Sequence, residues 1–227
     1  MATAAGTSRD TTPFLANHSK MTYDGKMARP RKFDEDTVIE AARNQFWHHG
    51  YEGTSMAQLC EATGVGSQSL YGAFGSKRDL FVRTLGDYCG NQLTGLTQSE
   101  EAASDSWAWL MAAVTFEDDG RIGLTRDGCY LSDSAAALSR LDDKVHDASR
   151  RTFTEILGVF ATALTRAKSQ GVVRPDVNVE EAALSLLVAM QGVEFLRKSG
   201  LDDGQFEKAK SSTIDGLSRA FTIHAEN

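Results

Sequence analysis

The chain has 227 residues, of which 41% are hydrophobic, and its formal net charge is −7. This length allows one large or two small cores, and no apolar run approaches the roughly 20 residues of a membrane-spanning helix. The three cysteines stand at no regular spacing, which argues against a disulfide scaffold or a zinc site. We therefore expect a protein of the reducing cytoplasm, without a signal peptide.

The first 27 residues are rich in Thr, Ser, Ala and Asp and have no hydrophobic periodicity. That composition predicts a flexible tail. A short basic arm follows at residues 28–32 and contains Arg29 and Arg31. After the arm, apolar residues at helical spacing predict an amphipathic helix over about Asp34 to His49.

The next segment contains the start and stop signals of a short helix and a tight turn. Ser55, which follows Thr54 and stands three positions before Gln58, can form a capping box at the start of this helix. Gly64 is expected to end it, because glycine adopts the positive φ of a helix C-terminus at little cost.

A second short helix is expected after the turn, with Ser67 as its cap and Phe74 near its end. Its first turn and outer face carry Ser67, Gln68, Ser69 and Tyr71. Two short helices joined by a tight turn are the geometry that places one helix in the major groove of DNA. The segment therefore predicts DNA binding.

Charge is distributed unevenly along the chain. From Lys26 to Arg83, eight Lys and Arg oppose seven Asp and Glu, so this part is +1 and the remainder is −8. Most cations of this part lie in the basic arm and at the start of the next helix, where Ser76 can cap a helix that begins with Lys77. Contacts to DNA phosphates are expected at these two places.

Beyond Ser76 the pattern predicts helices separated by short polar loops, with no alternating segment long enough for a strand. A Gly- and charge-rich loop is expected over 117–128. The expected helices are 79–92, 105–116, one from 132 or 133, 142–169, one capped by Asn178 that ends near Lys198, and 205–224.

The helix that ends near Lys198 has more than one apolar stripe, and a helix of this kind is buried on more than one side. We assign Leu184, Leu187, Val188 and Phe195 to the core of the same chain, and Leu187 is also a candidate for the dimer interface. The further apolar positions, which we assign to a dimer interface, are Ala182, Leu186, Ala189, Met190 and Val193. A central core helix in a monomer is the alternative.

The first half of the chain resembles the DNA-binding domain of TetR-type repressors. The resemblance covers about Arg29 to Leu85, and its combined spacing is specific although each piece alone is weak. It is carried by Arg29-Pro30-Arg31, Ala41-Ala42 with Phe46, Gly50-Tyr51 with Thr54-Ser55, Gly64-Val65, Leu70-Tyr71 with Phe74, and Lys77 with Leu80-Phe81. The remainder is similar only in kind, being helical and of suitable length.

The resemblance implies an all-α fold with an N-terminal three-helix helix-turn-helix domain and a helical domain for ligand binding and dimerisation. We expect a flexible tail over 1–27, the DNA-binding domain over 28–75 and the effector-binding and dimerisation domain over 76–227. A homodimer would bind a palindromic double-stranded DNA operator as a regulator, most simply a repressor, and a small hydrophobic effector would release it. No cofactor, metal or membrane contact is expected, and no recognisable catalytic motif indicates an enzyme.

The expected DNA contacts have different roles. Gln68 suits bidentate pairing with adenine, whereas the hydroxyl of Thr54 and the charge of Lys77 suit phosphate. The basic arm can enter the minor groove. The full set is Arg29, Arg31, Thr54, Ser55, Ser67, Gln68, Ser69, Tyr71 and Lys77.

Residues of the second half are candidates for an effector pocket between the helices over 105–116, 142–169 and 179–198, although aromatic residues at helical spacing are more often core. The pocket candidates are Trp107, Trp109, Met111, Phe116, Cys129, Phe153 and Leu157. The residues expected at the dimer interface are Leu187, Met190, Ile214 and Leu217.

Two alternative functions stay open. Cys129 follows the Gly- and charge-rich loop, and a thiol- or redox-sensing repressor would use it if the thiol is accessible and its surroundings favour the thiolate. An all-α enzyme or carrier for a hydrophobic small molecule is the second alternative, and turnover without DNA binding would favour it. Of the other cysteines, Cys60 is expected at a small buried position and Cys89 near the end of a helix.

Overall fold

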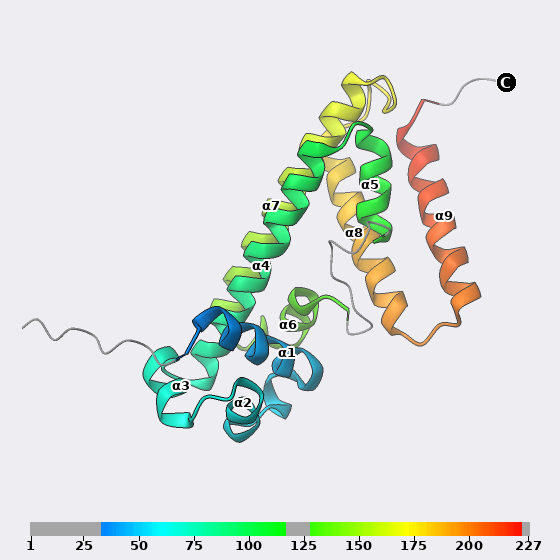
Figure 1. Ribbon diagram of the computed structural model, residues 1–227. Coiled ribbons are helices and arrows are strands. Elements are labelled where there is room, and N and C mark those ends of the chain that lie inside the picture. The colour runs from blue at the N-terminus through cyan, green and yellow to red at the C-terminus, as the bar shows by residue number, and fades with distance from the viewer. Residues whose placement is uncertain (1–32, 117–127, 224–227) are drawn as a thin grey trace, which may run out of the picture. The chain divides into compact units, whose positions relative to one another are not determined.

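We describe residues 33–116 and 128–223 of a computed structural model (Figure 1). Within these residues the chain forms nine α-helices and no strand longer than an isolated bridge, which confirms the expected all-α class. None of these helices combines the length and apolar character needed to cross a membrane. The helices are α1 (Glu35–Gly53), α2 (Met56–Thr63), α3 (Ser67–Phe74), α4 (Lys77–Ala102), α5 (Ser106–Thr115), α6 (Tyr130–Leu138), α7 (Asp143–Ser169), α8 (Val179–Lys198) and α9 (Asp203–Phe221).

The predicted start and stop signals of α2 are confirmed. The hydroxyl of Ser55 accepts a hydrogen bond from the backbone N–H of Gln58 at 3.3 Å, and the side-chain oxygen of Gln58 accepts one from the backbone N–H of Ser55 at 2.8 Å. Gly64 has a φ of 67° and ends the helix. These contacts join residues at most a few positions apart, which explains why the sequence alone could reveal them.

The expected cap of α3 is wrong by one residue. Gly66, in extended backbone, is the N-cap, and its carbonyl oxygen accepts hydrogen bonds from the backbone N–H groups of Ser69 and Leu70 at 2.9 and 3.1 Å. Ser67 is instead the first residue of the helix. Ser76 does cap α4, because its hydroxyl accepts a hydrogen bond from the backbone N–H of Asp79 at 3.0 Å.

Several helix boundaries differ from the expected ones. The first helix ends at Gly53 and not at His49, with a kink at Gly50, whose φ is 71°. The fourth helix continues past Gln92 to Ala102, where we expected a stop, because it packs along α7 and this tertiary contact overrides the glycines in its sequence. The sixth helix begins at Tyr130, ahead of the expected Ser132 or Asp133, and the last helix ends at Phe221. The expected loop over 117–128 lies outside the described residues except for Gly128.

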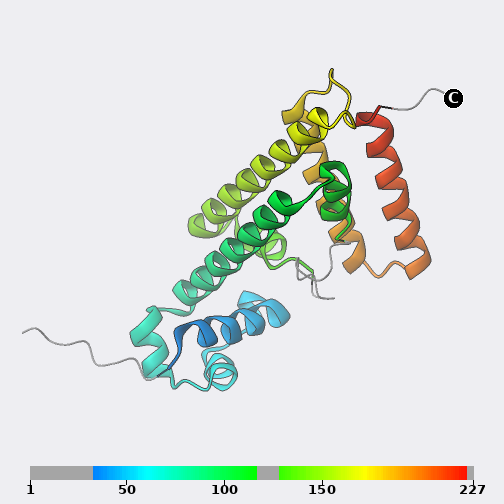
Figure 2. The same cartoon turned by 45° about the horizontal axis from the view of Figure 1, so that its top comes forward.

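Two apolar cores run along the helices α4 and α7, which lie side by side in both ribbon views (Figure 1, Figure 2). The N-terminal core joins α1, α2 and α3 to the first half of α4, to α6 and to the start of α7. The C-terminal core joins the end of α4 to α5, α7 and α8, and the inner face of α9 packs against it. Because both cores share α4 and α7, a displacement of these helices acts on both.

The assignment of the two faces of α8 is wrong. The stripe that we gave to the dimer interface is buried in the same chain, with Leu186, Met190 and Val193 exposed by 8% or less. Of the stripe that we gave to the core, Val188 and Phe195 face outward and are 72% and 67% exposed, whereas Leu187 is half-buried and packs against the C-terminal core. Both stripes are apolar, so periodicity alone could not tell which of them the partner helices cover.

Candidate nucleic-acid interface and internal pocket

The first two turns of α3 present an exposed polar surface. Ser67, Gln68, Ser69 and Tyr71 are all exposed, whereas Leu70 on the opposite side is buried in the N-terminal core. We call these four exposed residues the recognition surface. Their side chains are therefore free to meet base edges, and their first turn lies at the helix N-terminus.

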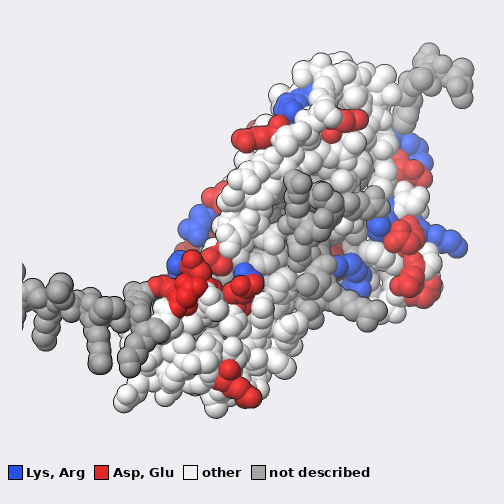
Figure 3. Space-filling view, viewed as in Figure 1, with Lys and Arg blue, Asp and Glu red and all other residues white. Residues whose placement is uncertain are grey.

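The surface over α2 and α3 is almost without charge. Glu61 is the one charged residue between Thr54 and Ser76 in the sequence, and the corresponding region is mostly white in Figure 3. Attraction to phosphate must therefore come from outside the recognition surface.

The cations next to α3 are largely engaged within the protein. Arg78 forms a two-pronged ion pair with Asp142, with Nε–Oδ2 and Nη2–Oδ1 distances of 2.5 and 2.8 Å. Lys77 is half-buried, with its ammonium group 4.3 Å from the centroid of the Tyr51 ring. A cation over an aromatic face keeps its charge, so Lys77 can still attract a phosphate, whereas the charge of Arg78 is already balanced.

The expected phosphate contact of Thr54 is wrong. Its side chain is 1% exposed, and its hydroxyl donates a hydrogen bond to the carbonyl oxygen of Gly50 at 2.8 Å. The hydroxyl thus fixes the turn between α1 and α2. Ser55 is exposed at the N-terminus of α2 and is therefore better placed than Thr54 to contact a phosphate. Arg29 and Arg31 lie outside the described residues, so their contacts stay a prediction.

A partly open pocket, which we call the internal pocket, lies between α4, α6, α7 and α8. Phe116, at the C-terminus of α5, also contributes to its wall, and among the described residues it is the one non-glycine residue with positive φ, at 58°. The walls are mostly apolar with a few polar groups, as is usual for small-molecule sites. The lining residues are Tyr88, Cys89, Gln92, Leu93, Leu96, Phe116, Cys129, Leu131, Thr152, Ile156, Met190, Gln191 and Glu194.

Only two of the pocket candidates, Phe116 and Cys129, line this pocket. Trp107 and Met111 are buried in the C-terminal core, and Leu157 packs against it. The indole N–H of Trp109 donates to Ser99 at 3.0 Å, while its ring packs against Phe160.

Phe153 instead lines a shallow groove with Leu187, Val188 and Gln191. We missed the α4 wall, because we ended this helix at Gln92 and placed Cys89 near its end. The helix-spaced residues Gln92, Leu93 and Leu96 were the signal that could have revealed it.

The residues expected at the dimer interface also make contacts within their own chain. Met190 lines the pocket and is 8% exposed, so its assignment to the dimer interface is wrong. Leu187, Ile214 and Leu217 are half-buried and pack against the C-terminal core.

Tyr130 connects the pocket wall to the N-terminal helices. It follows the pocket residue Cys129, is 2% exposed, and its ring lies 5.8 Å from Trp47 of α1 and 5.6 Å from Tyr88 of α4 (centroid distances). Its hydroxyl oxygen is 3.0 Å from that of Thr84 on α4. Burial raises the pKa of the Tyr130 phenol, so it stays neutral and hydrogen-bonded.

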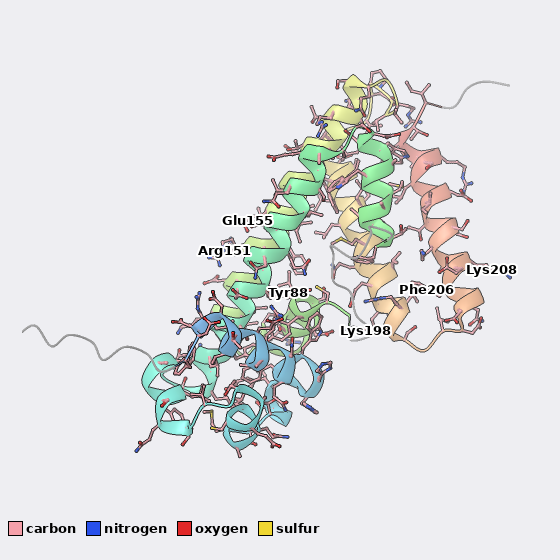
Figure 4. The ribbon with its side chains drawn as sticks, in the orientation of Figure 1. Tyr88, Arg151, Glu155, Lys198, Phe206 and Lys208 are labelled. Carbon is pink, nitrogen blue, oxygen red and sulfur yellow. The ribbon has the colours of Figure 1, made fainter. Side chains whose placement is uncertain are left out.

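Polar side chains of α8 hold the start of α6. The buried carboxylate of Glu194 accepts a hydrogen bond from the backbone N–H of Cys129 at 2.9 Å, and the ammonium group of Lys198 lies 3.4 Å from the same oxygen. Lys198 also pairs with Asp133 of α6. Figure 4 shows Lys198 at the end of α8 and Tyr88 beside α6. A movement of α8 would therefore pull on the segment next to Tyr130.

Two family models match the chain in sequence order. The model of bacterial regulatory proteins of the tetR family matches residues 38–84, which contain α2 and α3. The model of the tetracyclin repressor-like C-terminal domain matches residues 118–212.

Known regulators are similar over most of the chain. The HTH-type transcriptional repressor ComR of Escherichia coli (strain K12) is 27% identical over 194 residues, which are 82% of this chain and 90% of ComR. The uncharacterized HTH-type transcriptional regulator YezE of Bacillus subtilis (strain 168) is 29% identical over 166 residues, 71% of this chain and 81% of YezE.

Among solved structures, a cysteine mutant of the TetR family transcriptional regulator CifR, complexed with 26 bp of double-strand operator DNA, is 28% identical. Its TM-score is 0.65, and the match covers 85% of this chain and 99% of the CifR chain. The matching models, the relatives and the helix order agree with one another, and the chain therefore belongs to the TetR family of transcriptional regulators.

Proposed function

We propose that the protein is a homodimeric repressor that binds operator DNA through α3 and releases it when a small, mostly apolar effector enters the internal pocket. The single observation that carries this proposal is the recognition surface: four exposed side chains on a short helix whose other face is anchored by Leu70. Such a helix can enter the major groove as a rigid unit.

Sequence-specific readout is assigned to Gln68 with its two serine neighbours. An amide side chain can pair with adenine through two hydrogen bonds, and the serine hydroxyls accept or donate to any base edge. Tyr71, which is 48% exposed, would contact phosphate or a thymine methyl group. The near absence of charge over α2 and α3 leaves the phosphate contacts to Lys77 and the basic arm.

The homodimer is assigned to the outward stripe of α8. Leu184, Val188 and Phe195 stand four and seven positions apart and are more than half exposed. Monomers rarely leave several large apolar side chains in one helical stripe in water, and a twofold arrangement would cover them with the same stripe of a second copy. The two operator half-sites would then be spaced by this interface.

Release of DNA is assigned to the connection between pocket and N-terminal core. Cys129 lies in the pocket wall, and the next residue, Tyr130, packs against Trp47 and Tyr88. A ligand that displaces Cys129 would therefore displace Tyr130 as well. Tyr130 contacts Trp47 of α1 directly. In this proposal α6 has two positions, each coupled to one orientation of α1 to α3. A ligand that fits one position better shifts the equilibrium between the two orientations.

A selection of genomic DNA fragments on the purified protein tests the proposal. We expect enrichment of a palindromic site, and specific affinity in the range of about 10⁻⁸ to 10⁻¹¹ M at physiological salt. Fluorescence anisotropy on the enriched site then measures the affinity of each variant. Recovery of fragments without a common sequence would contradict the proposed operator recognition.

A further inference from the structure

The first turn of α4 carries two neighbouring cations, Lys77 and Arg78. The recognition helix α3 ends at Phe74, so only two residues separate it from this turn. Each cation that neutralises a DNA phosphate raises affinity for DNA of any sequence, and this gain depends on salt. The number of cations that this turn presents to DNA therefore sets part of the sequence-independent affinity.

Arg78 is held by a carboxylate of its own chain. Its Nε and Nη2 atoms lie 2.5 and 2.8 Å from the two carboxylate oxygens of Asp142. This two-pronged geometry is also the one in which a guanidinium binds a phosphate. The edge of Arg78 that suits a phosphate is thus occupied, and its charge is balanced without DNA.

Asp142 is fixed in place by a second role. As the N-cap of α7, its Oδ1 atom accepts hydrogen bonds from the backbone N–H groups of Lys144 and Val145 at 2.9 and 3.3 Å. Its side chain is 13% exposed, against 44% for that of Arg78. Ion pairs with such access to water are weak, so the guanidinium is the partner that can leave and the carboxylate is the partner that stays.

The carboxylate next to Arg78 in the sequence, that of Asp79, is already engaged. Its Oδ2 atom accepts a hydrogen bond from the hydroxyl of Ser76 at 2.6 Å, and its Oδ1 atom accepts one from the ammonium group of Lys144 at 3.1 Å. It is therefore not free to replace Asp142. A phosphate beside the first turn of α4 would offer a released Arg78 a charged partner of suitable geometry.

We infer that Asp142 is a positioning residue for DNA binding, which withholds Arg78 from the DNA backbone and keeps the sequence-independent affinity low. The inference goes beyond the proposed function, because it concerns neither the operator sequence nor the effector. It rests on that function only in placing α3 and the start of α4 at the DNA. Lys77 keeps its charge over the ring of Tyr51, so the parent presents one of the two cations.

Salt titrations of binding to a random-sequence DNA duplex, followed by fluorescence anisotropy, test the inference. Asp142→Asn keeps a capping side chain and frees Arg78, so the slope of log affinity against log salt concentration should steepen by about one unit. The gain in affinity over the parent should then shrink by about three- to fourfold between about 50 and 200 mM salt. Asp143→Asn, the control, removes the same charge from the same turn without a bond to Arg78 and should keep the parent's slope.

A substitution of the arginine completes the cycle. Arg78→Gln alone should keep the parent's slope, because Asp142 already balances the charge that it removes. Arg78→Gln combined with Asp142→Asn should abolish the steepening. Asp142→Ser, whose side chain can also cap α7, repeats the test, and melting temperatures establish that each variant is folded in the assay.

The inference fails if Asp142→Asn and Asp143→Asn have the same slope. It also fails if Arg78→Gln alone makes the slope shallower by about one unit, because Arg78 would then contact a phosphate in the parent. Lys77→Ala on the same duplex separates these results from a failure of the proposed function. A shallower slope in Lys77→Ala with no change in Asp142→Asn rejects only the withheld arginine, whereas an unchanged slope in both also rejects the placement of α4 at the DNA.

Discussion

The hydroxyl groups of Tyr130 on α6 and Thr84 on α4 lie 3.0 Å apart in a fully buried hydrogen bond. Thr84 also donates to the carbonyl oxygen of Phe81 at 2.8 Å, so Tyr130 can donate to Thr84 in turn. This chain of donors fixes the ring of Tyr130 between α1 and α4. The segment that lines the pocket is therefore tied to the helix that carries the N-terminal domain.

We expect Tyr130→Phe to fold and to lose about 1 kcal/mol of unfolding free energy, because the substitution removes one buried hydrogen bond and keeps the ring. Urea denaturation measures the difference. Tyr71→Phe is the matched control, because its hydroxyl is removed from an exposed side chain, and stability should change by less than about 0.5 kcal/mol. An equal loss in both variants would contradict the role of the Thr84 contact.

We expect Gly128→Ala to destabilise the protein by at least about 1–2 kcal/mol, because φ is +83° at this position. The added Cβ would also overlap the end of Lys198, which would have to leave Asp133 and Glu194. Gly90→Ala is the control: this glycine is helical and its Cβ would meet no atom within 4 Å. For Gly90→Ala we expect the free energy of unfolding to rise by about 0.5–1 kcal/mol. Thermal melting checks that the two substitutions change stability in opposite directions.

The Arg78–Asp142 ion pair predicts a pH dependence. The hydrogen bond from Arg78 holds the pKa of the Asp142 carboxyl below its usual value. A carboxyl with a depressed pKa in the folded state contributes stability above its unfolded pKa of about 3.9, and this contribution is lost as pH falls through the folded pKa. Asp142→Asn, which can still cap α7, should therefore be less stable than the parent at pH 7, and the difference should shrink below about pH 4.

Urea denaturation at several pH values measures this difference. Asp143→Asn is the control, because Asp143 lies in the first turn of the same helix without a bond to Arg78. A difference between parent and Asp142→Asn that is constant from pH 7 to pH 3 would show that the charge of the Asp142 carboxylate does not contribute to stability.

The recognition surface and Lys77 should have distinct effects on DNA binding. Gln68→Ala should weaken operator binding by about 1–3 kcal/mol and binding to random DNA little. Lys77→Ala should weaken binding to the operator and to random DNA alike. It should also reduce the slope of log affinity against log salt concentration by about one unit. Gln98→Ala on α4 and Lys208→Ala on α9, both exposed, are the controls. Unchanged operator affinity in Gln68→Ala and Lys77→Ala would reject α3 as the reading helix.

The outward stripe of α8 should hold the dimer. Val188→Asp places a carboxylate at a position that is 72% exposed in the isolated chain, so the monomer should fold normally. Burial of that carboxylate in a dimer is costly, and we expect a monomeric mass by light scattering at micromolar concentration. Leu141→Asp, at a position that is 82% exposed outside α8, should stay dimeric. The interface would be contradicted if Val188→Asp and Leu141→Asp were both dimeric or both monomeric.

The sequence by itself determined the features that depend on close neighbours in the chain. Ser55 with Gln58 and the positive φ of Gly64 define α2, and Ser76 and Asn178 cap later helices as expected. Each of these contacts spans a few residues, so the residue types and their spacing contain the information. The same local signals place Gln68 and Tyr71 on a short helix after a tight turn.

Only the tertiary structure decided which apolar face of each helix is covered. Met190 and Val188 are equally apolar neighbours of one helix, and the packing of α5 and α7 buries the first and exposes the second. The pocket and the position of Tyr130 depend on contacts between residues 41 to 65 positions apart. Such contacts follow from the competition among all helices for a shared core, which periodicity within one helix does not contain.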